Sequence, residues 1–174
     1  MPIHITTPNP DDAQGITTVL YKTWLATYPN SALGITTEDI DDSYKDSFTE
    51  AQIKKSQENL KNIPAHKKTV VAKDGATVVG VATMVKNEHN NQLRTLYVLP
   101  KYQGKGIGTM LWKAIKDFID PNKETVVQVA DYTQQAIKFY EKLGFIDTGK
   151  RVQEERWKMN SGAYIPEMEM VLRQ

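Results

Sequence analysis

The sequence contains no cysteine and only three histidines among its 174 residues. Disulfides, thiolate metal sites and a cysteine nucleophile are therefore excluded. The histidines, His4, His66 and His89, are far apart in the chain, so they predict no metal site. No stretch approaches the roughly 18 consecutive apolar residues of a membrane-spanning helix, and the N-terminal residues lack the basic and apolar regions of a signal peptide. We expect a cytoplasmic protein without a metal.

The sequence also has almost no excess of charge of either sign. The chain has 22 Lys and Arg against 21 Asp and Glu, a net charge of +1. It therefore offers no broad positive field for nucleic acid or an anionic membrane, and we expect neither as a partner. Its apolar fraction of 40% and its length fit one globular domain over residues 1–174.

The most informative stretch covers residues 93–118, LRTLYVLPKYQGKGIGTMLWKAIKDF. An apolar run with strand character, Leu96 to Leu99, stops at Pro100. A glycine-rich segment follows, and apolar residues then recur at helical spacing. These helical positions are Ile107, Leu111, Ala114, Ile115 and Phe118. The pattern predicts a strand, a glycine loop and a helix, in that order.

The glycine loop has the properties of an anion site. Gly104, Gly106 and Gly108 lack Cβ atoms where a helix begins, so a ligand can approach unpaired backbone N–H groups. The helix dipole and Lys105 add positive charge, which favours a phosphate or pyrophosphate. The alternative is a tight turn with Lys105 in solvent.

Three phosphate-loop patterns compete for this stretch. The spacing of a Walker A loop does not occur, and G-x-G-x-x-G fails because its sixth position is Thr109 or Leu111. The pattern Gln/Arg-x-x-Gly-x-Gly/Ala is met by Gln103, Gly106 and Gly108. Together with LYVLP before it and AIKFYEKLGF at residues 136–145, the loop resembles the acetyl-CoA site of the GNAT superfamily of N-acetyltransferases.

This resemblance implies an α/β (α+β) fold: a central mixed, mostly antiparallel twisted sheet flanked by helices, with a splayed parallel strand pair that holds the cofactor. It also implies acetyl transfer from acetyl-CoA to a primary amine by direct attack in a ternary complex. The expected pantetheine contacts come from the strand backbone of Leu96, Tyr97 and Val98. The expected pyrophosphate contacts are Gln103, Gly104, Lys105, Gly106, Ile107, Gly108 and Thr109.

The resemblance also names a catalytic candidate, Tyr140, in the helix that carries a tyrosine beside the cofactor sulfur. A phenol with a reference pKa of about 10 is protonated at neutral pH and can supply a proton to the departing thiolate. The alternative is a structural tyrosine that packs with Phe139.

Two positions depart from the family pattern. Thr133 stands where relatives often have an Asn that contacts the cofactor; its hydroxyl can still cap the helix and donate one hydrogen bond. Gln92 stands where relatives often have a glutamate base. The remaining base candidates are Glu88, His89 and Asp131, or else a water relay or an amine that is already neutral.

The acceptor cannot be read from the sequence: small amines, polyamines and protein N-termini or lysines all fit. Trp24 and Tyr28 lie where the family builds one wall of the acceptor pocket. Asp39, Asp42 and Asp46 would share one helical face, which is either an attraction for a cation or an ordinary solvated face. The alternative functions are an acyl-CoA sensor without turnover and an NAD-dependent oxidoreductase. Related proteins are often dimers, so a homodimer is a further expectation.

The rest of the chain predicts alternating short strands and helices. We expect a strand at 3–6, a helix from Asp11 or Asp12 to before Pro29, and a helical stretch that contains Ile40, Tyr44 and Phe48. Another helix runs from Thr49 to Pro64. A hairpin of strands 69–72 and 77–85, a strand at 125–130 parallel to 93–99, and a closing hairpin of 145–148 with 167–172 complete the sheet.

Overall fold

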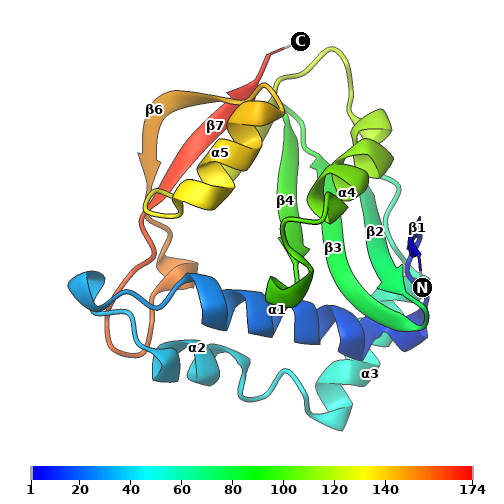
Figure 1. The fold of residues 1–174 in the computed structure, drawn as a ribbon, viewed down its shortest axis with the longest axis horizontal. Helices are drawn as coiled ribbons and strands as arrows, with labels where there is room; N and C mark the ends of the chain where they lie inside the picture. Colours follow the sequence, from blue (N-terminus) through cyan, green and yellow to red (C-terminus); the bar gives the residue numbers. More distant parts are fainter. Residues whose placement is uncertain (1, 174) are drawn as a thin grey trace.

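The computed structural model describes residues 2–173, with the backbone alone at Arg156. Its centre is a seven-stranded sheet in the order β1-β2-β3-β4-β5-β7-β6 (Figure 1). The strands are β1 (Ile3–Thr6), β2 (Lys67–Asp74), β3 (Thr77–Lys86), β4 (Asn91–Val98), β5 (Thr125–Ala130), β6 (Ile146–Val152) and β7 (Glu167–Leu172). All neighbours are antiparallel except β4 and β5, which are parallel. The predicted mixed, mostly antiparallel sheet and its closing hairpin are confirmed.

Helices cover both faces of this sheet. They are α1 (Ala13–Thr27), α2 (Thr37–Tyr44), α3 (Glu50–Lys61), α4 (Ile107–Ile115) and α5 (Gln134–Lys142). A Cβ at Gly80 of β3 would lie 3.1 Å from Leu111 of α4, whereas the next residue, Val81, lines a cavity with Ile16 and Leu20 of α1. Since successive strand residues point to opposite faces, α1 and α4 lie on opposite sides of the sheet. No helix within residues 2–173 has the length and apolar character needed to span a membrane.

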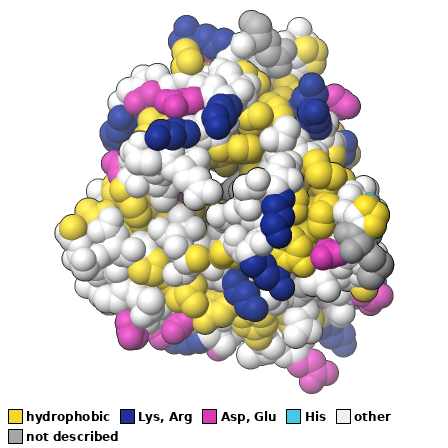
Figure 2. Space-filling model, in the orientation of Figure 1, with side chains coloured by type: hydrophobic (Ala, Val, Ile, Leu, Met, Phe, Trp, Pro, Cys, Tyr) yellow, Lys and Arg dark blue, Asp and Glu magenta, His cyan; other side chains and the backbone are white. Residues whose placement is uncertain are grey.

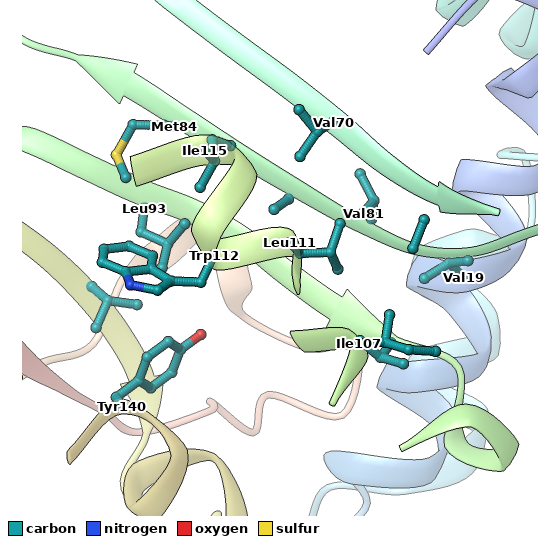
Figure 3. Packing of buried hydrophobic residues seen from close by; sticks show 14 of the residues in the cluster. Val19, Val70, Val81, Met84, Leu93, Ile107, Leu111, Trp112, Ile115 and Tyr140 are labelled. Atoms are coloured by element: carbon teal, nitrogen blue, oxygen red, sulfur yellow. The ribbon is translucent and has the colours of Figure 1, made fainter. Parts of the chain in front are cut away.

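The apolar stripe of α4 fixes the helix on the sheet. Leu111 and Ile115 are fully enclosed and belong to one hydrophobic cluster with Val70 of β2 and other strand residues (Figure 3). Each such branched side chain contributes about 1.5–3 kcal/mol when it is removed from water. The α-helix ends at Ile115, and the predicted helical residues 116–118 form a 3-10 turn.

One helical prediction is wrong. The spacing of Ile40, Tyr44 and Phe48 predicts a single helix, but α2 ends at Tyr44, and Phe48 lies in a turn with 41% of its surface exposed. Residues 45–48 form turns, and Thr49 then takes an extended backbone and caps the separate helix α3 by accepting a hydrogen bond from the Gln52 N–H. An extended cap residue cannot continue the preceding helix.

The predicted acidic face does not form. Asp39 is buried, with 4% exposed, and accepts hydrogen bonds from the N–H groups of Thr36 and Ser161 at 2.9 and 3.0 Å. Asp42 accepts one from the Asn160 side chain, and Asp46 lies beyond the end of α2. Asp39 therefore joins the start of α2 to the loop that precedes β7. Burial alone would raise the pKa of Asp39, but these hydrogen bonds hold it below its ordinary value.

Asn91, fully buried at the start of β4, fixes the closed end of the parallel pair. Its Nδ2 donates to the carbonyls of Asp120 and Lys123 at 3.0 and 3.1 Å, and its Oδ1 accepts from the Asp120 N–H at 2.9 Å. The pairing then covers only Asn91 to Leu93 of β4 against Thr125 to Val127 of β5. A register shift against β3 leaves Arg94 as a bulge immediately afterwards. Beyond this point β4 and β5 separate.

Candidate active site

The separation of β4 and β5 opens a cleft of about 860 Å³. On one side it is bounded by β4 and the start of α4, and on the other by β5 and α5. Figure 2 shows apolar surface in the hollow between α4 and α5, with Lys and Arg side chains along its sides. Within the described chain, Lys138 and Lys142 of α5 line this cleft. Its size and positive rim suit a long, anionic ligand.

The backbone of β4 is directed into the cleft. The Leu99 N–H donates to the Val79 carbonyl of β3 at 2.9 Å. Because the N–H groups of successive strand residues alternate between the two edges, the Val98 N–H faces the cleft. The Val98 carbonyl accepts a hydrogen bond from the Gln103 side chain at 3.0 Å, which ties the glycine loop to the end of β4.

The glycine loop has the conformation that the sequence predicts. Gly104 and Gly106 have φ angles of +74° and +79°, which side chains on L-residues rarely tolerate. Gly106 is the N-cap of α4, where no side chain takes the first N–H groups. A Cβ at Gly108 would lie 3.2 Å from the Phe139 ring, so this glycine permits close approach of α4 and α5.

The structure brings all but one of the predicted cofactor residues together. The cleft is lined by Leu96, Tyr97, Val98, Gln103, Gly104, Gly106, Ile107, Gly108, Thr109 and Thr133. Lys105 is not among the lining residues: it is exposed, and its Nζ lies 5.2 Å from the centre of the Tyr102 ring. Thr133 is the N-cap residue of α5, as predicted, but its side chain makes no capping hydrogen bond, because its hydroxyl donates to the Ala130 carbonyl at 2.7 Å.

Tyr140 lies in the wall of the cleft with 7% of its surface exposed. Its ring packs against those of Phe139 and Phe145, with centroids 5.4 and 5.7 Å away, and Figure 3 shows the hydroxyl directed away from α5. Burial, with a smaller effect from Tyr97, raises the pKa of this phenol far above its usual value. The hydroxyl therefore remains protonated over the whole physiological range.

A second cavity of about 400 Å³ lies on the α1 side of the sheet. Trp24 and Tyr28 form part of its wall, and Trp157 packs on Trp24 with ring centroids 5.3 Å apart. The two cavities meet at the splay, where five residues line both: Tyr28, Leu93, Arg94, Tyr97 and Gln128. The two cavities are therefore neighbours that share part of their walls.

Three tyrosines meet at this point through hydrogen bonds that the sequence does not predict. The hydroxyls of Tyr28 and Tyr97 lie 2.9 Å apart, and the Tyr132 hydroxyl donates to the Tyr28 carbonyl at 2.9 Å. For Tyr97 the sequence does contain an indication. Side chains alternate along a strand, so that of Tyr97 must lie on the opposite face from those of Leu96 and Val98. Nothing local to Tyr28 or Tyr132 indicates that they meet.

The base candidates from the sequence lie elsewhere. The side chains of Glu88 and His89 are each 88% exposed in the turn before β4, and neither lines a cavity. Asp131 also lines neither, whereas Gln92 does line the second cavity. Over residues 2–173 no three His, Asp or Glu side chains gather as metal ligands would.

The site thus combines a mixed sheet with one splayed parallel pair, a glycine loop at a helix start and two cavities that share lining residues at the splay. The family model described as the acetyltransferase (GNAT) domain matches residues 32–160. The chain belongs to this family.

Solved structures share the fold at low sequence identity. PaiA N-acetyltransferase from Thermoplasma acidophilum, in complex with coenzyme A, has a TM-score of 0.69 and 20% identity over 97% of this chain and 98% of its own. The acetyltransferase YncA from Salmonella typhimurium, with acetyl-CoA, has a TM-score of 0.67 and 18% identity over 98% and 93%. A GNAT acetyltransferase from Streptococcus pneumoniae has a TM-score of 0.71 and 15% identity over 98% of both chains. A comparison with curated protein sequences gives no match.

Proposed function

We propose that this protein transfers an acetyl group from acetyl-CoA to a primary amine by direct attack in a ternary complex. The observation that carries the proposal is the meeting of two cavities at the separated β4 and β5 strands. One cavity suits the long acetyl donor, and the other suits a small acceptor. Membership of the GNAT family and the ligands of the PaiA and YncA structures support the choice of donor.

The residues of the larger cleft fit acetyl-CoA. Backbone groups of Leu96 and Val98 face the cleft and would hold the pantetheine arm, and the N–H groups from Gly104 to Thr109 would hold the pyrophosphate. The bound molecule supplies an acetyl group activated as a thioester. Lys138 and Lys142 add positive charge on the side of α5.

Tyr140 is the proposed general acid. Its buried hydroxyl keeps its proton at neutral pH and lies in the wall of the donor cleft, so it can donate to the sulfur as the thiolate departs. The chain has no cysteine to form an acyl-enzyme, which agrees with direct attack.

A second candidate function is an acyl-CoA sensor that binds without turnover. It is favoured by one observation: Gln92 occupies the position expected for a glutamate base, and Gln128 of β5, which lines the same cavity, is also an amide. Release of coenzyme A in the presence of amines separates the enzyme from the sensor.

The first experiment is thermal unfolding with acetyl-CoA, coenzyme A, NAD and ATP in parallel. A ligand at about 100 times its Kd stabilises the folded state by roughly 2.7 kcal/mol. We expect stabilisation by acetyl-CoA and coenzyme A alone. Stabilisation by NAD alone, or by none of the four, would contradict the donor assignment.

A further inference from the structure

Glu167 is the only Asp or Glu among the described residues that line the two cavities. It is the first residue of β7 and pairs with Ala130, the last residue of β5. The pairing places it at the open end of the splay, on the wall of the acceptor cavity. No sequence motif marks Glu167, which lies far along the chain from the glycine loop.

The carboxylate of Glu167 lies within electrostatic reach of the tyrosines at the meeting point. Burial is the main cause of the raised pKa values of Tyr28 and Tyr97, and the negative charge of Glu167 raises both further. The Tyr97 hydroxyl in turn raises the pKa of Tyr140, although burial is the larger cause. One carboxylate and three protonated hydroxyls are thus gathered where the cavities join.

The surroundings of Glu167 suit an ammonium group. Trp24 and Trp157 form an aromatic wall of the same cavity, and aromatic faces attract cations. Among the described side chains, the other charged residues in the lining are Lys67 of β2 and Arg94 of β4, both exposed. These two cations repel a positively charged ligand. Glu167 is therefore the feature of this cavity that would attract an ammonium group.

We propose that Glu167 binds the primary ammonium group of the acceptor and takes its first proton. This inference rests on the proposed function, and it assigns to β7 the task that Gln92 cannot perform on β4. The acceptor class is a primary amine on a slender apolar or aromatic stem, since the acceptor cavity is small and has aromatic walls.

The proton balance of the reaction is then complete. The ammonium gives its first proton to Glu167, which passes it to solvent. The neutral nitrogen forms a bond to the acetyl carbon, and the carbon–sulfur bond breaks. Tyr140 protonates the departing sulfur, and the second proton lost by the nitrogen restores the Tyr140 hydroxyl. The products are an N-substituted acetamide, coenzyme A as the free thiol, and one proton.

The chain offers a matched control for Glu167. Glu169 lies two residues further along β7, on the same face, and loses the same charge in a Glu→Gln change. Its carboxylate forms an ion pair with Lys150 at 3.1 Å and lines neither cavity. We would compare wild type, Glu167→Gln and Glu169→Gln by acetyl-CoA affinity, by coenzyme A release with pentylamine and spermidine, and by melting temperature.

We expect Glu167→Gln to keep its acetyl-CoA affinity and melting temperature while kcat/KM for the amine falls about 100-fold or more. The Glu169→Gln variant should remain close to wild type. In wild type, kcat/KM should fall as acid protonates the carboxylate, and this acidic limb should be absent in Glu167→Gln. A merely structural role would not remove that limb.

Binding can be followed separately from turnover. Trp24 and Trp157 line the acceptor cavity, so pentylamine should change tryptophan fluorescence in wild type but not in Glu167→Gln. The uncharged 1-pentanol should change the tryptophan fluorescence of both proteins only weakly. If Glu167→Gln does not fold, Glu167→Asp replaces it. We expect this variant to keep the carboxylate but to have a lower kcat/KM than wild type.

The outcomes separate the inference from the proposed function. Absence of acetyl-CoA binding in wild type overturns the proposed function. Acetyl-CoA binding without coenzyme A release for either amine overturns the acceptor assignment and favours the sensor. Turnover in which Glu167→Gln equals wild type, or in which Glu169→Gln loses as much activity, overturns the role of Glu167 alone.

Discussion

The two sides of β4 differ in what they are made of. The donor cleft is largely a backbone site, formed by the unpaired edge of β4 and by glycines whose side chains are absent. The acceptor cavity is a side-chain site, with walls from α1, β4, β5, β7 and the segment around Trp157. A backbone site can be specified by one contiguous motif, whereas a side-chain site requires the whole fold.

Sequence separation expresses the same difference. Gln103 bonds the Val98 carbonyl from five positions away, and the whole glycine loop lies within the following six residues. Where the acceptor cavity adjoins the cleft, the Tyr28 and Tyr97 hydroxyls meet across 69 positions, and the Tyr132 hydroxyl reaches the Tyr28 carbonyl across 104. Changes at the donor cleft should therefore affect one ligand, and changes on the acceptor side should affect the other.

The largest effect should come from Tyr140→Phe, in the wall of the donor cleft. Loss of the proton donor should lower kcat about 100-fold or more, with a small change in acetyl-CoA affinity, because the ring and its packing remain. Steady-state kinetics and calorimetry measure the two quantities. Tyr164→Phe is the control, since that hydroxyl bonds the exposed Glu155 away from both cavities. Equal turnover in both variants would remove Tyr140 from the chemistry.

Gly106→Val should weaken acetyl-CoA binding at least about tenfold, because it adds strain at a φ of +79° and a branched side chain where anions approach the α4 N-terminus. Calorimetry with coenzyme A measures this. Gly149→Val provides the control: its φ is +80°, with open space around the added Cβ, but it lies on β6 outside the cleft. If both variants bind equally well, the loop is not the pyrophosphate site.

Asp39→Asn should lower the free energy of unfolding by about 1–3 kcal/mol at pH 7, because it weakens a helix cap and a buried hydrogen-bonded carboxylate. The folded pKa of Asp39 lies below its unfolded value, so its contribution is present above the unfolded pKa and is lost as the pH falls through the folded one. Urea unfolding at pH 7 and at about pH 3 should show the difference from wild type shrinking in acid. A difference that grows in acid would reverse the assigned sign.

The smallest effect should come from Thr133→Val. Its hydroxyl serves the Ala130 carbonyl, so the change should cost about 0.5–1.5 kcal/mol of stability and alter acetyl-CoA affinity little. Chemical unfolding and calorimetry on the same samples test this. A large loss of affinity with normal stability would instead make Thr133 a direct cofactor contact.

Much of the fold could be predicted because its patterns are local. The glycine loop, the apolar stripe of α4 and the hairpin of β2 with β3 each depend on residues adjacent in sequence. The prediction for Phe48 failed because the apolar spacing at intervals of four continues past the end of α2 at Tyr44, into a turn that precedes the Thr49 cap of α3. The prediction that Asp39 lies on an acidic helix face failed for a related reason. Its carboxylate turns back and accepts a hydrogen bond from the Thr36 N–H, which caps its own helix.

The sequence by itself determined the donor side: Gln103, Gly106 and Gly108 specify a loop whose function resides in N–H groups and missing Cβ atoms, and such features need only neighbouring residues. Only the tertiary structure decided the acceptor side. There, Tyr28 from α1, Tyr97 from β4 and Glu167 from β7 meet because the sheet places β7 beside β5 and because β4 and β5 separate. Side-chain chemistry at such a junction depends on contacts between distant segments, which no local pattern encodes.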